Sequence, residues 1–195
     1  MNLPFAHRVI FSEDEIADRV QELGREITAF YKERQGPAAS VVIVSMLKGA
    51  FVFLADLMRY IELDLSVDFM AISSYGATDT KSGVRIEKDL SGSIYNQNVM
   101  IVEDIIDTGL TLSYILRNLK SRAPAEIKIC TLLDRAVARI APIEIDYRGF
   151  EVGREFFIGY GLDYRQKWRN LKYICSPEGL EEENGESVLA LFGDP

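Results

Sequence analysis

The stretch Val99-Met100-Ile101-Val102-Glu103-Asp104-Ile105-Ile106-Asp107-Thr108-Gly109-Leu110-Thr111 decides the expected fold of this chain. It opens with four apolar residues in a row, a pattern typical of a strand that is buried on both faces. A polar loop follows, and apolar residues then recur at helical spacing, at Leu112, Ile115, Leu116 and Leu119. A buried strand that leads directly into a helix is the repeating unit of a parallel α/β sheet.

The same alternation of strand and helix extends to both sides of this stretch. A capping box at Ser12 and Glu15 predicts a helix that ends near Gly36-Pro37. Further strands are predicted over 41–44, 65–73 and 127–133, and a further helix over 50–60. The predicted face of the first helix consists of Ile16, Val20, Leu23, Ile27 and Phe30. The sequence therefore predicts an α/β fold with a central parallel sheet covered on both faces, in a single domain over residues 1–195.

The negative charge of the chain is concentrated at its C-terminal end. The 195 residues have a formal net charge of −8, and six of the acidic residues lie in 177–195, a segment without Lys or Arg. The rest of the chain is close to neutral and has no basic stripe, so we expect no nucleic-acid partner. We expect the tail at about 177–195 to be a solvated or partly disordered end.

Cysteine usage and hydropathy indicate the compartment. Cys130 and Cys175 stand 45 positions apart, which fits neither a disulfide framework nor a zinc site. No apolar run approaches the roughly 18 residues of a membrane-spanning helix, and the N-terminus lacks a secretory pattern. We therefore expect a cytoplasmic protein with no membrane association.

The loop after the strand at 99–102 has the chemistry of a ligand site. Ligands of parallel sheets bind beyond the carboxyl ends of the strands, where Glu103, Asp104 and Asp107 stand in this chain. Thr108 and Thr111 supply hydroxyls around Gly109, and a helix start provides free amides for an anion. A phosphate beside three carboxylates requires hydroxyls or a divalent cation between them, which indicates a phosphorylated sugar with magnesium. The alternative is an ordinary strand-to-helix turn with a polar cap.

The stretch 102–111 resembles the phosphoribosyl-pyrophosphate (PRPP) binding motif of the type I phosphoribosyltransferases. From about Phe11 to Ile174 the chain resembles the 6-oxopurine branch of that family, the hypoxanthine-guanine phosphoribosyltransferases. The blocks that match in order and spacing are Leu47-Lys48-Gly49, Ser74-Tyr75-Gly76, Gly149-Phe150-Glu151-Val152 and Gly159-Tyr160-Gly161-Leu162-Asp163-Tyr164. The resemblance implies a type I phosphoribosyltransferase-like sheet with a small hood, built from the N-terminal arm and residues 142–176. It also implies transfer of phosphoribosyl from PRPP to hypoxanthine or guanine, giving IMP or GMP and pyrophosphate, with Mg²⁺ as cofactor and a homo-oligomer, a dimer or tetramer.

The resemblance assigns roles on the PRPP side of the site. Glu103 and Asp104 would hold the ribose hydroxyls and the magnesium shell, and Asp107 would be the acid/base residue. The 5′-phosphate would lie on the backbone at Thr108, Gly109, Leu110 and Thr111. Pyrophosphate would meet Lys48, Gly49 and Arg169, with a strained peptide, a candidate for the cis form, at Leu47-Lys48. The alternatives are a plain loop with a solvated Lys48 and surface charges at Arg169 and Asp163. Asp163 would meet a second magnesium, and Ser74 and Tyr75 would act in a mobile lid over 73–92, for which the alternative is an exposed hairpin loop.

On the purine side, the resemblance implies that Phe156 stacks on the base and that the backbone of Phe157 reads its edge. The alternative for both is packing in a core strand. Arg135 stands where the family has Lys, as the donor to the 6-oxo group, so the preference among purines is open. The chain also has Val152-Gly153-Arg154-Glu155 where the family usually shows Pro-Asp. Cys130, Cys175 and Trp168 are predicted to be packing residues.

Two other functions compete with this interpretation. The first is the same reaction on xanthine or another base. The second is a non-catalytic regulator on the same fold that binds nucleotide and RNA, against which the acid/base carboxylate of Asp107 and the absence of a basic patch both argue.

Overall fold

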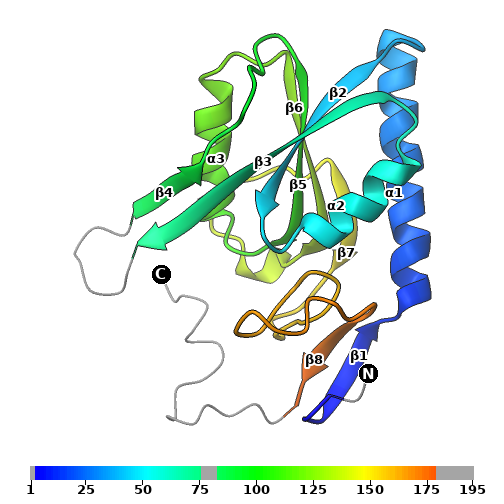
Figure 1. Ribbon diagram of the computed structural model, residues 1–195, viewed down its shortest axis with the longest axis vertical. Helices are drawn as coiled ribbons and strands as arrows, with labels where there is room; N and C mark the ends of the chain where they lie inside the picture. The colour runs from blue at the N-terminus through cyan, green and yellow to red at the C-terminus, as the bar shows by residue number, and fades with distance from the viewer. Residues whose placement is uncertain (1–2, 76–82, 179–195) are drawn as a thin grey trace.

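The fold is a six-stranded sheet with helices on both faces, seen in a computed structural model that describes residues 3–75 and 83–178 (Figure 1). The strand order is β4-β3-β2-β5-β6-β7, and every neighbouring pair is parallel except β3 and β4. The strands are β2 (Ser40–Leu47), β3 (Asp64–Tyr75), β4 (Gly83–Lys88), β5 (Asn98–Ile106), β6 (Glu126–Asp134) and β7 (Tyr147–Glu151). The predicted parallel α/β architecture is confirmed.

Helices bury both faces of the sheet. On one face lie α1 (Glu13–Gln35) and α2 (Phe51–Leu57), which continues into the 3₁₀ turn η1 (Met58–Tyr60); on the other lies α3 (Leu110–Lys120). Met100 and Val102 of β5 pack in the core beneath α1 and α2, whereas Val99 and Ile101 pack in the core beneath α3. The continuous apolar run of this strand therefore follows from its burial on both sides.

The helices begin and end close to the positions predicted from the sequence. The Ser12 hydroxyl accepts from the Glu15 backbone and the Glu15 carboxylate accepts from the Ser12 backbone, which is the expected capping box. A short 3₁₀ turn, η2 (Ala136–Ala138), follows β6. In the part of the chain that the structure describes, no helix is long and apolar enough to cross a membrane.

A small hood lies beyond the carboxyl ends of the parallel strands (Figure 1). It consists of β1 (His7–Phe11), β8 (Ile174–Pro177), which pairs antiparallel with β1, and the connection 152–173. The backbones of hood and sheet meet at Gly161, where an added Cβ would lie 2.2 Å from the Gly49 oxygen. Glycine at 161 therefore permits the hood to close on the loop after β2.

Two predictions of local structure differ from the observed fold. The predicted lid over 73–92 is partly an antiparallel pair, since β3 reaches Tyr75 and β4 covers Gly83–Lys88; residues 76–82 lie outside the described ranges. Residues 147–151 form strand β7 of the main sheet, so the predicted hood boundary at 142 was wrong. Both strands lie at edges of the sheet, where one-sided burial removes the continuous apolar run that identified the central strands.

The predictions for packing residues and for the tail are tested only in part. Cys130 and Cys175 are buried free thiols, and the Trp168 ring stacks on Tyr164 at 5.9 Å, as expected of packing residues. Pro177 ends β8, and the backbone of Glu178 donates to the Ala6 carbonyl. The predicted tail from 179 onward lies outside the described residues.

Candidate active site

Two adjoining cavities open where β2, β5 and β6 end. The first, of about 250 Å³, lies over the start of α3 and is here named the loop cavity. The second, of about 150 Å³, lies between that loop and the hood and is named the hood cavity. Asp104, Ile105 and Asp107 line both, so two carboxylates stand at the junction. The loop cavity is lined by Met46, Leu47, Gly49, Ile72, residues 103–109, Thr111 and Leu112, and the hood cavity also by Arg135, Phe156, Phe157, Leu162 and Asp163.

A larger cavity of about 350 Å³ lies elsewhere, between α1, α2 and the hood. Arg169 is its only predicted site residue, and no residue of 102–111 lines it. Its size therefore does not make it the better candidate, because the loop and hood cavities contain the acidic and hydroxyl groups.

The carboxylates at the end of β5 are strongly perturbed. Burial raises the pKa of Glu103 well above its usual value, and the neighbouring Asp104 charge raises it further. Burial also raises the pKa of Asp104 to about 6, although the Ile105 amide, 2.9 Å from Oδ1, and the Arg169 charge oppose the rise. Such acids bind a proton or a cation readily. A Cβ at Gly49 would lie 1.6 Å from Asp104 Oδ2, so the backbone after β2 lies directly against this carboxylate.

Asp107 begins the turn into α3. Burial raises its pKa, and the charges of Arg135 and Arg139 oppose this rise. Gly109 then takes a φ of +77° as N-cap, with no side-chain cap for the helix that begins at Leu110. The Leu110 amide donates to the Thr108 hydroxyl at 3.4 Å. The start of a helix attracts an anion, and phosphate binding at Thr108, Gly109, Leu110 and Thr111 stays a prediction.

The Arg135 guanidinium bridges this turn and the hood. Its Nη1 lies 2.6 Å from Asp107 Oδ1, its Nε donates to the Gly153 carbonyl at 3.0 Å, and its Nη2 donates to the Glu155 carbonyl at 2.7 Å. The group also lies 5.5 Å from the centre of the Phe157 ring. An arginine has five N–H donors, so hydrogens remain on both terminal nitrogens for a ligand in the hood cavity.

The two phenylalanines form one wall of the hood cavity. Phe157 is 4% exposed, and Phe156 packs edge-on against Tyr164 at 6.0 Å. Residues 152–157 form no strand, but Phe157 belongs to the hydrophobic core, so the alternative is wrong about the strand and right about the packing of Phe157. They follow the sheet edge at β7 and cross into the hood, where an aromatic wall suits a flat ring.

Lys48 and the end of β3 both border the loop cavity, which Leu47, Gly49 and Ile72 line. The Leu47-Lys48 peptide is cis, as the resemblance suggested, and the Lys48 side chain is exposed and lines neither cavity. Ser74 and Tyr75 end β3, next to Ile72 of the loop cavity, and their side chains lie outside what the structure describes.

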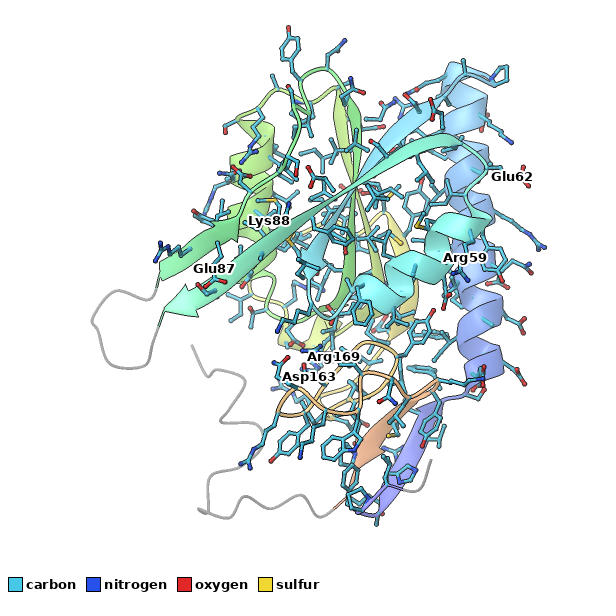
Figure 2. All side chains as sticks on the ribbon, viewed as in Figure 1. Arg59, Glu62, Glu87, Lys88, Asp163 and Arg169 are labelled. Atoms are coloured by element: carbon cyan, nitrogen blue, oxygen red, sulfur yellow. The ribbon has the colours of Figure 1, made fainter. Side chains whose placement is uncertain are left out.

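Asp163 and Arg169 pair with each other within the hood. Asp163 Oδ1 lies 2.6 Å from Arg169 Nη2, and its other oxygen accepts from the Gln166 amide at 2.7 Å. Arg169 Nη1 donates to the Gly161 carbonyl at 2.7 Å. Figure 2 shows both side chains on the part of the hood nearest to the sheet.

The donor set fits a magnesium ion only with help from a ligand. Among residues 3–75 and 83–178, no three His, Cys, Asp or Glu side chains converge as metal ligands. Magnesium is usually held by one or two carboxylates together with substrate phosphates and water. Glu103 and Asp104 meet that requirement, whereas both oxygens of Asp163 already have protein partners.

Sequence reasoning missed the charged residues beneath the turn at 107–109. Asp134 is 1% exposed at the end of β6 and pairs with Arg139 and Arg148. The position of Asp134, directly after an apolar strand, was the signal that could have found this group, because a carboxylate that is buried there needs charged partners.

Comparison with known proteins agrees with this geometry. The chain matches the Phosphoribosyl transferase domain family over residues 12–165. It is 49% identical to the hypoxanthine phosphoribosyltransferase of Buchnera aphidicola subsp. Schizaphis graminum, over 86% of this chain and 93% of the relative. It is 46% identical to the hypoxanthine-guanine phosphoribosyltransferase of Bacillus subtilis, over 86% and 91%.

The solved structures that resemble this chain have the same names as these relatives. A crystal structure of a hypoxanthine phosphoribosyltransferase from Staphylococcus aureus superimposes with a TM-score of 0.81 at 43% identity, covering 88% of this chain and 91% of the other. The fold, the acidic turn between two cavities and these similarities together show that the chain belongs to the phosphoribosyl transferase family.

Proposed function

We propose that this protein transfers the 5-phosphoribosyl group of PRPP to hypoxanthine or guanine, giving IMP or GMP and pyrophosphate in purine salvage. One observation supports this most directly: Asp107 and Asp104 stand at the junction of the loop cavity and the hood cavity. The loop cavity, at the start of α3, suits a phosphoribosyl group. The hood cavity, with an aromatic wall and an arginine donor, suits a 6-oxopurine.

Asp107 acts as the acid/base residue at the imidazole ring of the base. As the C1′–oxygen bond to pyrophosphate breaks and the C1′–nitrogen bond to the purine forms, the purine gives up a proton, which the carboxylate accepts. The negative charge of Asp107 also favours the positive charge that develops on the ribose. Burial raises its pKa toward the working pH, which improves proton transfer.

Glu103 and Asp104 hold the ribose hydroxyls and Mg²⁺. A bound magnesium ion neutralises charge on the pyrophosphate leaving group. Lys48, the Gly49 backbone and Arg169 meet the pyrophosphate, and Ser74 and Tyr75 help to exclude water from the site. Asp163 would hold a second magnesium with the lone pairs that its contacts to Arg169 and the Gln166 amide leave open.

The hood cavity selects the base. Phe156 stacks on the purine and Phe157 presents its backbone to the ring edge. The remaining hydrogens of Arg135 donate to an acceptor at position 6, which disfavours the donor that adenine presents there. Xanthine also has an acceptor at this position, so it is the second candidate substrate.

The remaining features of the proposal follow from family membership and composition. The protein is a single phosphoribosyltransferase domain over 1–195, works in the cytoplasm, and assembles as a dimer or tetramer. It binds neither nucleic acid nor membrane, in line with the near-neutral charge of residues 1–176.

One assay tests the proposal. The purified protein is incubated with PRPP and Mg²⁺ against hypoxanthine, guanine, xanthine, adenine and uracil, and pyrophosphate release is measured. We expect release with hypoxanthine and guanine and none with adenine or uracil. Release with none of the five bases, from protein that binds PRPP, would favour the regulator instead.

A further inference from the structure

Asp134 connects two arginines at the end of β6. The side chain is 1% exposed, and its two oxygens pair separately, one with Arg139 Nη2 and the other with Arg148 Nε at 2.7 Å. A buried carboxylate is stable only when it is paired and hydrogen-bonded, so this residue fixes the guanidinium groups around it.

Of the two arginines, only Arg139 reaches the turn that contains Asp107. Its Nη2 also donates to the Ile106 carbonyl at 3.3 Å, and its side chain lies against Gly109, where an added Cβ would lie 3.2 Å from Cδ. The Arg148 side chain is 46% exposed and pairs instead with Asp134 and, at 3.6 Å, with Glu151.

The backbone after Arg139 holds the same turn. The amides of Ile140 and Ala141 both donate to the Thr108 carbonyl at 2.9 Å, and the Ile106 carbonyl also accepts from the Arg135 amide at 3.0 Å. The carbonyls on both sides of Asp107 are therefore held from the segment 135–141, whose charged residues are Arg135 and Arg139.

Arg139 also brings positive charge to the anion-binding end of α3. Its Nη1 is buried and has no hydrogen-bond partner among the described residues, and it lies 3.4 Å from the place of a Cβ on Gly109. A guanidinium with an unpartnered nitrogen beside the start of a helix favours a phosphate there.

We propose that Arg139, fixed by Asp134, is a positioning residue that holds the turn 106–109 in the form that receives the 5′-phosphate and aims Asp107. This inference rests on the proposed PRPP-dependent function. It predicts a residue that governs affinity for PRPP without touching the purine.

Arg139→Met tests the proposal, because methionine keeps much of the stem and removes the charge and the donors. A hydrogen bond to a charged group corresponds to about a ten- to hundredfold effect, so we expect KM and Kd for PRPP to rise by about that factor. The KM for hypoxanthine should change less than threefold by our reasoning, since Arg139 does not line the hood cavity. Arg139→Lys, which keeps the charge, should recover part of the PRPP affinity.

Arg148→Met is the matched control, since it removes the other partner of Asp134 and leaves the turn untouched. Calorimetric titration with PRPP and Mg²⁺, steady-state kinetics and thermal unfolding are measured for all variants. A purely structural role for Arg139 predicts similar losses of Tm for both methionine variants and no selective change for PRPP. That result, or a PRPP Kd of Arg139→Met equal to wild type, would overturn the inference.

The binding measurement separates this inference from the proposed function. Wild-type protein that binds PRPP but releases no pyrophosphate refutes the proposed reaction and still allows the comparison of variants. Wild-type protein that binds no PRPP refutes both. If Arg139→Met does not fold, the comparison of Arg139→Lys with Arg148→Lys decides, because both keep the charge beside Asp134.

Discussion

Replacement of Arg135 tests the centre of the site, because this residue contacts both the acid/base carboxylate and the hood. In Arg135→Ala, Asp107 loses its partner at 2.6 Å, and the carbonyls of Gly153 and Glu155 lose their donors. Arg135→Lys keeps a charge but has one nitrogen, which cannot reach all three acceptors with the fork geometry of arginine.

The two hood contacts set the size of the effect. Each hydrogen bond from a charged donor contributes about 1.5–3 kcal/mol. Arg135→Lys, which loses one of them, should therefore lower kcat/KM for hypoxanthine by at most about ten- to hundredfold. Arg135→Ala should lower it by about a hundredfold or more. The ion pair with Asp107 adds little to this loss, because the Asp107 side chain is 42% exposed and water screens the charges.

The pH profile gives a second, independent measure. Burial raises the pKa of Asp107, and the Arg135 charge is the larger of the two arginine charges that oppose the rise. Removal of the Arg135 charge leaves only the Arg139 charge to oppose the effect of burial, so the pKa of Asp107 moves further upward. Because Asp107 must be ionised to accept the proton, the acid limb of kcat/KM should shift to higher pH in Arg135→Ala and stay near wild type in Arg135→Lys.

Stopped assays of pyrophosphate release with hypoxanthine and guanine, across pH 5–9 by our design, measure both effects. Arg154→Met is the control, since Arg154 is exposed on the hood and, among the described residues, its Nη2 donates to the Val137 carbonyl alone, at 3.3 Å. Wild-type kcat/KM in Arg135→Ala would refute the role of the hood contacts. An acid limb that does not move would refute the influence of Arg135 on the pKa of Asp107.

Three further predictions follow from the carboxylates and the glycine at the junction. Asp107→Asn should lower kcat by about 10²–10⁴-fold while calorimetry shows little change in PRPP affinity, because the amide keeps the shape but cannot take a proton; near-normal turnover would remove Asp107 from the mechanism. Gly49→Ala should abolish most PRPP binding with little change in Tm, since its Cβ would lie 1.6 Å from Asp104 Oδ2, and a normal Kd would show that the loop shifts freely. Excess chelator should stop turnover. The Kd for PRPP with Mg²⁺ should rise as pH falls through about 6, because Asp104 becomes protonated there and ceases to attract the cation. In Asp104→Asn, the Kd should lose this dependence on pH.

Much of the site was predictable because its chemistry lies in one continuous segment. Residues 102–111 form a strand end, a turn and a helix start, and local geometry alone places their carboxylates and amides together. The roles assigned to them remain predictions. The aromatic wall at Phe156 and Phe157 was also identified, although its backbone is irregular and not a strand.

The supports of the site were not predictable in the same way. The sequence predicts that Arg135 donates to a ligand. The structure shows that it also contacts Asp107 and two hood carbonyls. The resemblance predicts that Asp163 is a metal ligand, yet in the structure its oxygens pair with Arg169 and accept from the Gln166 amide. Such contacts join segments that are distant in the chain, and no local pattern encodes them.

The sequence by itself determined the architecture, because burial on both faces requires continuous apolar strands such as 99–102, and the helix that follows needs its own apolar stripe. Only the tertiary structure decided which charges meet. Asp134 lies in the interior because β6 and β7 pair around it. The buried carboxylate pairs with Arg139, whose side chain then lies beneath the turn at Asp107. Hydrophobic periodicity specifies which faces are covered, whereas ion pairs depend on distances between side chains that exist only once the chain has folded.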